Sequence, residues 1–122
     1  MDEHVTLAEI KGRVRRFRQE RGWDSRDTPK DLAIGISTEA AELLEHFQFR
    51  TTEECRAALA DPEEGPAIAA ELADILFFAA GFADQFGIDL SEAMEKKQAA
   101  LAARHPVDSA SASARLWRRR GP

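Results

Sequence analysis

The sequence predicts an all-α fold, a bundle of four to five helices in one domain over residues 1–108. Apolar residues recur every three to four positions in four stretches of the chain, and short breakers rich in Gly, Pro, Asp and Ser separate these stretches. No alternation of apolar and polar residues is long enough to predict a strand. At 122 residues, the chain has the size of one domain with a sizeable core.

The first two long helices are predicted from apolar spacing and from residues that begin or end helices. The first runs from about Thr6 to Arg21 and stops at Gly22, and residues 23–29 follow as a loop. The second runs from about Pro29 to Phe49, with Thr28 as its N-cap. The two apolar stripes contain Leu7, Ile10, Val14 and Phe17, and then Leu32, Ile36, Ala40, Leu43 and Phe47.

The second half of the chain repeats this pattern. A short helix is predicted around Thr52–Ala60, and a third long helix over about Pro66–Phe86, with Gly87 in a natural C-cap position. The fourth helix starts between residues 89 and 91 and ends before Pro106. The stripe of the third helix contains Ile68, Leu72, Ile75, Ala79, Phe82 and Phe86.

Composition and charge exclude several classes of protein. The single cysteine, Cys55, excludes an internal disulfide and a cysteine-based zinc site, and fits a reduced, cytoplasmic setting. The most apolar run, residues 66–83, contains Glu71 and Asp74. A carboxylate at mid-bilayer costs about 2.5–3.5 kcal/mol, so we expect no membrane span.

The last residues differ in composition from the rest. An Ala/Ser-rich linker and a basic tail, together residues 109–122, are predicted to be flexible, and four arginines fall within residues 115–120. A net charge of −5 argues against general binding to nucleic acid, and we expect no nucleic-acid partner.

Two pairs of carboxylates are the most informative feature. Glu39 and Glu42 lie three residues apart on the second helix, and Glu71 and Asp74 three apart on the third. Residues at this spacing are neighbours on one helix face. Glu39 and Glu71 border the apolar stripes, so if the stripes pack together, four carboxylates converge on one edge of the seam.

Four converging anions repel one another and require a compensating cation. Oxygen ligands without nearby His or Cys favour Mg²⁺, with Mn²⁺ as a substitute, over zinc, and such a site would hold triphosphate oxygens and activate water. The alternative is that the pairs form a solvated face. Against it, Glu71 and Asp74 are the only charges between residues 66 and 83.

Four further residues have a functional and a structural interpretation. Trp23 could stack a nucleobase or anchor the core or a subunit contact. Lys30 and Lys97 could meet phosphate oxygens or be solvated surface lysines. Glu45 continues the series 39–42–45 and could be a further ligand, a supporting group or a surface residue.

The motif ExxE at 39–42, a 28-residue spacer and ExxD at 71–74 occur together with matching segments along residues 10–108. The sequence resembles the MazG-like branch of the all-α nucleotide pyrophosphohydrolases, and its dCTP pyrophosphatase group in particular. The segments that carry the resemblance are 17–23, 28–32, 39–49, 71–76, 86–90 and 104–107.

The resemblance implies hydrolysis of a nucleoside triphosphate to the monophosphate and pyrophosphate, as nucleotide-pool housekeeping. Glu39, Glu42, Glu71 and Asp74 would then bind Mg²⁺ and carry the catalysis. It also implies a homodimer or homotetramer with active sites near subunit contacts. The broad apolar surface of the third helix independently predicts an oligomer.

The departures from the family pattern fall on base and phosphate contacts. Phe49 stands where the family has tryptophan, and Phe78 where it has tyrosine. Asp27 replaces a histidine and Asp31 an asparagine, while Lys97 remains. The substrate-binding residues are therefore expected to be Trp23, Lys30, Phe49, Phe78 and Lys97.

The preferred base and sugar stay open, with dCTP or a modified dNTP as candidates. The alternative function is a non-catalytic helical module for nucleotide sensing or assembly.

Overall fold

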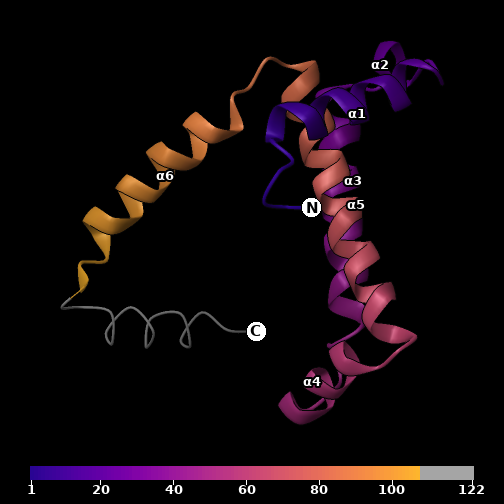
Figure 1. The fold of residues 1–122 in the computed structure, drawn as a ribbon, viewed down its shortest axis with the longest axis vertical. Helices are drawn as coiled ribbons and strands as arrows, with labels where there is room; N and C mark the ends of the chain where they lie inside the picture. Colours follow the sequence, from indigo (N-terminus) through magenta and orange to yellow (C-terminus); the bar gives the residue numbers. More distant parts are fainter. Residues whose placement is uncertain (108–122) are drawn as a thin grey trace. The chain divides into compact units, whose positions relative to one another are not determined.

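The computed structural model describes residues 1–107, and within that range it contains six α-helices and no strand (Figure 1). The predicted all-α fold is confirmed. The predicted linker and basic tail, residues 109–122, lie outside the described residues. The helices are α1 (Leu7–Gln19), α2 (Trp23–Arg26), α3 (Pro29–Glu45), α4 (Thr52–Ala60), α5 (Glu64–Gln85) and α6 (Leu90–Arg104).

The chain divides into two units, which are described separately. Residues 1–88 hold α1 to α5, and the described part of the second unit is mainly α6. Asp89 caps α6, since its carboxylate accepts the backbone N–H of Glu92 at 2.9 Å. Almost every side chain of α6 is exposed.

In the first unit, α3 and α5 lie side by side and run in opposite directions, and α4 joins them at one end (Figure 1). At the other end α1 packs against α5. Ala80, Gly81 and Ala83 on α5 are buried, and Gly81 lies against Val14 and Arg18 of α1. The helices α3 and α5 are the two that carry the predicted carboxylate pairs.

Local sequence signals fix where several helices begin. Thr28 caps α3 as predicted: its hydroxyl accepts the N–H of Asp31, whose carboxylate accepts the N–H of Thr28 in return. Pro29 occupies the first helical position. Thr6 and Glu9 form the same capping box at α1.

Several boundaries differ from the prediction, and the first long helix ends at Gln19 rather than Arg21. Residues 23–26 form a one-turn helix inside the predicted loop. The second long helix ends at Glu45, because the next turn tightens: the N–H of Phe47 donates to Leu44 O at 2.9 Å, one residue closer than in an α-helix. The third begins at Glu64, before the predicted Pro66, because Asp61 accepts the N–H groups of its first turn.

The core of this single chain is small. The buried apolar side chains are few, and many large apolar residues remain exposed. Among the described helices, α5 has the length and apolar composition needed to cross a membrane, a test that the core helix of a soluble protein also passes. Only 22% of its most apolar stretch is buried in the chain. Most of the apolar surface of α5 is therefore exposed among the described residues.

Candidate metal centre

The antiparallel packing of α3 and α5 brings three carboxylates together. One carboxylate oxygen each from Glu39, Glu42 and Glu71 lies within 4.8 Å of the other two. Glu39 and Glu42 come from adjacent turns of α3, and Glu71 from the facing side of α5. All three side chains are half-buried. We call these three residues the carboxylate cluster.

Two oxygens of the carboxylate cluster lack a partner. Glu39 Oε2 and Glu71 Oε2 are buried, and neither accepts a hydrogen bond within the described part of the chain. A buried acceptor left unsatisfied is costly, and more so when the group is charged. A divalent cation would satisfy both oxygens, and the donor set, carboxylate oxygen throughout, suits a hard ion. The residues present therefore fit a metal site.

The cluster also changes the acidity of its members. Burial, reinforced by the nearby carboxylates of Glu42, Asp74 and Glu71, raises the pKa of Glu39 to about 7. Burial is likewise the main cause that raises the pKa of Glu71, followed by Glu42 and Asp74. Both shifts show that the surroundings disfavour negative charge on these carboxylates when no cation is bound.

Asp74, the fourth predicted carboxylate, lies apart from the other three. It is exposed and is not among the residues whose oxygens approach within 4.8 Å. It is still close enough to raise the pKa of Glu39 and Glu71 by its charge. Helical spacing put both Glu42 and Asp74 one step farther from the apolar stripes than Glu39 and Glu71, so spacing alone did not separate Asp74 from Glu42.

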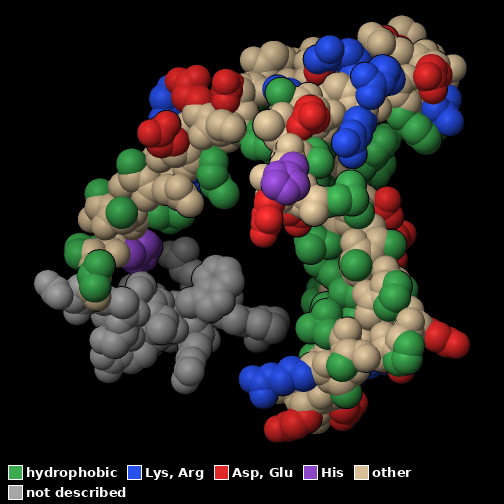
Figure 2. Space-filling model, viewed as in Figure 1, with side chains coloured by type: hydrophobic (Ala, Val, Ile, Leu, Met, Phe, Trp, Pro, Cys, Tyr) green, Lys and Arg blue, Asp and Glu red, His purple; other side chains and the backbone are tan. Residues whose placement is uncertain are grey.

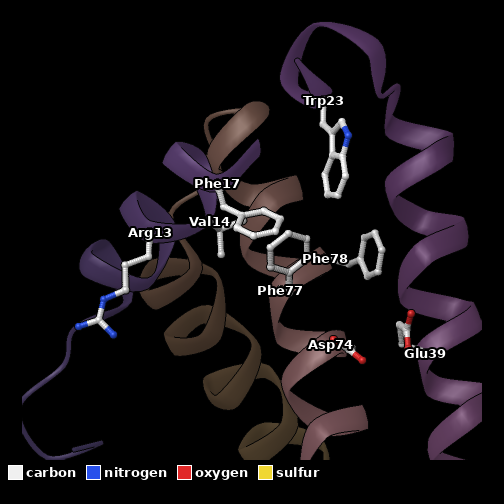
Figure 3. Close-up of a pocket in the computed structure, with 8 residues that line it drawn as sticks. All are labelled: Arg13, Val14, Phe17, Trp23, Glu39, Asp74, Phe77 and Phe78. Carbon is white, nitrogen blue, oxygen red and sulfur yellow. The ribbon is translucent and has the colours of Figure 1, made fainter. Parts of the chain in front are cut away.

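A pocket of about 540 Å³ adjoins the cluster. Glu39 and Asp74 form one end of its lining, and aromatic side chains from α1, α2 and α5 form most of the rest (Figure 3). The lining residues are Arg13, Val14, Phe17, Trp23, Glu39, Asp74, Phe77 and Phe78. The pocket thus joins a charged end to an apolar aromatic end.

The aromatic rings of the pocket contact one another in a chain. The Phe17 ring lies 5.7 Å from Trp23 and 5.7 Å from Phe77, both in edge-to-face orientation. Phe77 and Phe78 are 5.6 Å apart at nearly a right angle. Edge-to-face contacts of this kind favour defined ring positions. The aromatic end of the pocket is therefore an ordered surface.

The structure places the other predicted site residues as follows. Trp23 and Phe78 line the pocket. Lys30 and Glu45 on α3 are exposed, and Glu45 is outside the carboxylate cluster. Phe49 follows α3 with 92% of its surface exposed. Lys97 is exposed on α6, in the second unit, and its predicted phosphate contact remains a prediction.

Sequence reasoning did not assign several pocket residues to the site. Phe17 and Val14 were predicted as part of an apolar stripe, and Phe77 belongs to the broad apolar surface predicted for the third helix. Apolar spacing could not distinguish either from a pocket wall. Arg13 lies in an arginine-rich helix where no pattern separates one cation from the next. The fact that Arg18 is buried is also a finding of the structure alone.

A comparison with protein families decides the family. The model of the MazG-like family matches residues 34–118, more than half of the chain. This chain belongs to the MazG-like family. The matched range includes all four carboxylates predicted as metal ligands.

Curated relatives and a solved structure agree with the MazG-like assignment. The chain is 32% identical to bovine (Bos taurus) dCTP pyrophosphatase 1 over 109 residues, which cover 89% of the chain and 64% of that protein. It is 31% identical to the human (Homo sapiens) dCTP pyrophosphatase 1 over 112 residues, 92% of the chain and 66% of that protein. The chain thus spans about two-thirds of the length of these relatives.

The crystal structure of a pyrophosphatase from Archaeoglobus fulgidus DSM 4304 is 35% identical to this chain, with a TM-score of 0.77. The match covers 84% of this chain and 94% of the archaeal one. The predicted MazG-like architecture is therefore confirmed at the level of the fold.

Proposed function

We propose that this protein is a Mg²⁺-dependent nucleoside triphosphate pyrophosphohydrolase, which hydrolyses its substrate to the monophosphate and pyrophosphate. The observation that carries the proposal is the pair of partnerless buried oxygens on Glu39 and Glu71, beside Glu42 and at the mouth of an aromatic pocket. A pocket with an anionic, metal-binding end and an aromatic end suits a nucleotide, which carries phosphates at one end and a base at the other.

The charged end of the pocket would hold the metal. Glu39, Glu42 and Glu71 would bind the ion, and Asp74 would join them from the exposed side, with Mn²⁺ as a substitute for Mg²⁺. When bound, a divalent cation neutralises charge on phosphoryl oxygens and makes water a better nucleophile. The carboxylates would hold the ion at one end of the pocket, which would favour one orientation of the phosphates and the base.

The aromatic end would hold the base. Trp23 and Phe78 present ring faces and edges to the pocket (Figure 3), and stacking on an aromatic side chain is worth about 1–3 kcal/mol per base. The apolar walls also exclude water from that side. Lys30 and Lys97 are proposed as phosphate contacts. The curated relatives are named for dCTP, so dCTP or a modified dNTP is the first substrate to test.

We propose further that the active form is a homodimer or homotetramer. Large apolar side chains are exposed along α3 and α5, among them Ile34 at 52%, Leu44 at 55% and Leu72 at 59%. Figure 2 shows hydrophobic side chains along the column that these helices form. A second copy would cover this surface and could bring the exposed Phe49 to a neighbouring pocket. We place the protein in the cytoplasm, as a housekeeping enzyme of the nucleotide pool.

The test is a panel of the four dNTPs and four NTPs with Mg²⁺, scored for pyrophosphate release, with a parallel reaction in ¹⁸O-labelled water. Attack at the α-phosphorus leaves the label in the monophosphate. Label in pyrophosphate or orthophosphate would overturn the proposed reaction. Absence of turnover across the panel, together with a Mg²⁺-dependent rise in melting temperature, would instead support the non-catalytic nucleotide-sensing alternative.

A further inference from the structure

One charged side chain of the protein is almost fully buried away from the carboxylate cluster. Arg18 on α1 has 2% of its surface exposed. Its guanidinium lies over Gly81 of α5, where a Cβ atom would come within 3.4 Å of Arg18 Cδ. Arg18 thus packs directly against the backbone of α5 at Gly81. A buried arginine is stable only when partners satisfy its donors.

The partners of Arg18 all lie at the junction of α2 and α5. Its Nη2 donates to Gln85 Oε1 at 2.6 Å and lies 3.5 Å from Asp27 Oδ2, and its Nη1 donates to Gly81 O at 3.5 Å. Gln85 in turn donates from Nε2 to Asp27 O at 2.7 Å. The neighbouring Arg26 also donates from Nε to Asp27 Oδ1 at 3.1 Å, but within the described residues only Arg18 and Gln85 tie Asp27 to other helices, through its carboxylate and its backbone carbonyl.

Asp27 is the residue that ends α2. Its backbone N–H donates to Trp23 O at 2.9 Å and closes the single turn of this helix. A helix of one turn is not stable alone, and α2 has no side-chain cap at its start, where Gly22 has a positive φ of 67°. The position of α2 must come from tertiary contacts. Those found are the Arg18–Asp27–Gln85 network and the edge-to-face contact of Trp23 with Phe17.

We propose that Arg18 is a positioning residue of the aromatic pocket: through Asp27 it fixes α2, and so sets where the Trp23 ring stands against the substrate base. Arg18 is not among the residues that line the pocket, so it acts through Trp23. The family resemblance places histidine at position 27, and here an aspartate is the partner of the buried arginine. The inference rests on the proposed nucleotide substrate and assigns base discrimination to this network.

The experiment compares Arg18→Met with a matched control, Arg15→Met. Arg15 joins the same two helices through an ion pair with Asp84, but it is exposed and has no link to α2. Both variants are made in a Trp117→Phe background, so that Trp23 is the only tryptophan. The measurements are Trp23 emission and acrylamide quenching, KM and kcat over the nucleotide panel, and inhibition by inorganic tripolyphosphate, which has phosphates but no base.

In Arg18→Met, we expect altered Trp23 emission and quenching and a KM raised about tenfold for the best nucleotide, the scale of one lost base stack. Its kcat and its inhibition by tripolyphosphate should stay within about twofold, and Arg15→Met should match the parent in every measurement. Equal Trp23 spectra in folded Arg18→Met and its parent, or an equal loss of affinity for tripolyphosphate and nucleotide, would overturn the proposal.

Two further arms keep the test decisive. If Arg18→Met does not fold by circular dichroism, Arg18→Lys takes its place, because it keeps the cation but loses the fork that reaches Gln85 and Asp27 together. A partial rise in KM in this variant supports the proposal and an unchanged KM counts against it. If the parent hydrolyses no nucleotide, the proposed function fails, and the Trp23 spectra alone decide whether Arg18 positions α2.

Discussion

The ring of Phe78 lies directly against the backbone of Gly35: a Cβ atom at Gly35 would stand 2.5 Å from Cδ1 and Cε1 of that ring. No real Cβ contact is that short. The Phe78 ring can lie this close to α3 only because Gly35 has no side chain, and its distance from the pocket depends on that contact. Phe78 replaces the tyrosine of the family pattern, and one wall of the pocket thus depends on a residue with no side chain.

Gly35→Ala should therefore damage the pocket. The added methyl must push the Phe78 ring aside or separate α3 from α5, at a cost of about 1–3 kcal/mol in the free energy of unfolding. We expect a changed KM for the nucleotide, because a Phe78 ring displaced from Gly35 would move toward the pocket that it lines. Gly12→Ala is the control: nothing lies within 4 Å of its Cβ, and in mid-helix the change should stabilise by about 0.5–1 kcal/mol. Urea melts measure both, and equal stability of the two variants would contradict the assigned contact.

Glu42→Gln and Asp74→Asn should each abolish turnover while the helical fold stays intact. Each change removes a negatively charged metal ligand at nearly constant side-chain volume. We predict that turnover falls at least about a hundredfold. The exposed Glu53→Gln on α4 is the matched control and should be fully active. Activity of either site variant within about threefold of the parent would count heavily against the metal assignment. Circular dichroism and pyrophosphate release give the two readouts.

The stability of the metal-free protein should fall as the pH rises toward 7. The pKa of Glu39 is about 7 in the folded chain against an ordinary value of 4.5, so between these values the folded state binds more protons than the unfolded state. The stabilisation is present at low pH and is lost as the pH passes 7. Carboxylates with a lowered pKa, such as Asp84, are ionised above pH 5 in both the folded and the unfolded state. They therefore add no pH dependence to the stability in this range.

Thermal melts in EDTA from pH 5 to pH 8 measure this trend. Glu39→Gln should remove most of the decrease in melting temperature with pH. Mg²⁺ should reverse the sign of this dependence, because a cation binds the ionised form of the carboxylate cluster. A melting temperature that rises with pH in EDTA would show that the carboxylate cluster is not under repulsion.

The protein should be an oligomer in solution. Large apolar side chains are exposed along α3 and α5, and monomeric soluble proteins rarely expose a large contiguous apolar patch. Light scattering at low micromolar concentration should give two or four times the chain mass of 13.6 kDa. A monodisperse, folded and active species at the mass of one chain would refute the prediction.

The sequence was sufficient for the fold and for the shared face of Glu39 and Glu42, because both depend on local regularities. Thr28 and Pro29 mark a helix start through hydrogen bonds made within four residues. The spacing of Glu39 and Glu42 puts them on one face whatever they pack against. The exposed position of Asp74 depends instead on how α5 is rotated against α3, which spacing constrains only loosely.

The parts that sequence reasoning missed depend on contacts between distant residues. Helix α2 is a single turn held by Arg18 and Gln85, and Gln85 lies 58 residues from Asp27 and 67 residues from Arg18 along the chain. Its own residues carry only the weak signal of a polar loop. Arg18 is buried because it packs against Gly81 and Gln85 of α5, which lie 63 and 67 residues away along the chain, and no local pattern reveals that contact.

The two partnerless oxygens of Glu39 and Glu71 also bear on how long the protein survives in a cell. An ion that binds only the folded state lowers the population of open chains, and proteases cleave chains that have opened. A chain with a cation bound at its carboxylate cluster would be degraded slowly, and a chain without the cation would be degraded quickly. The abundance of the protein would then follow the supply of divalent cation, even without any change in its synthesis.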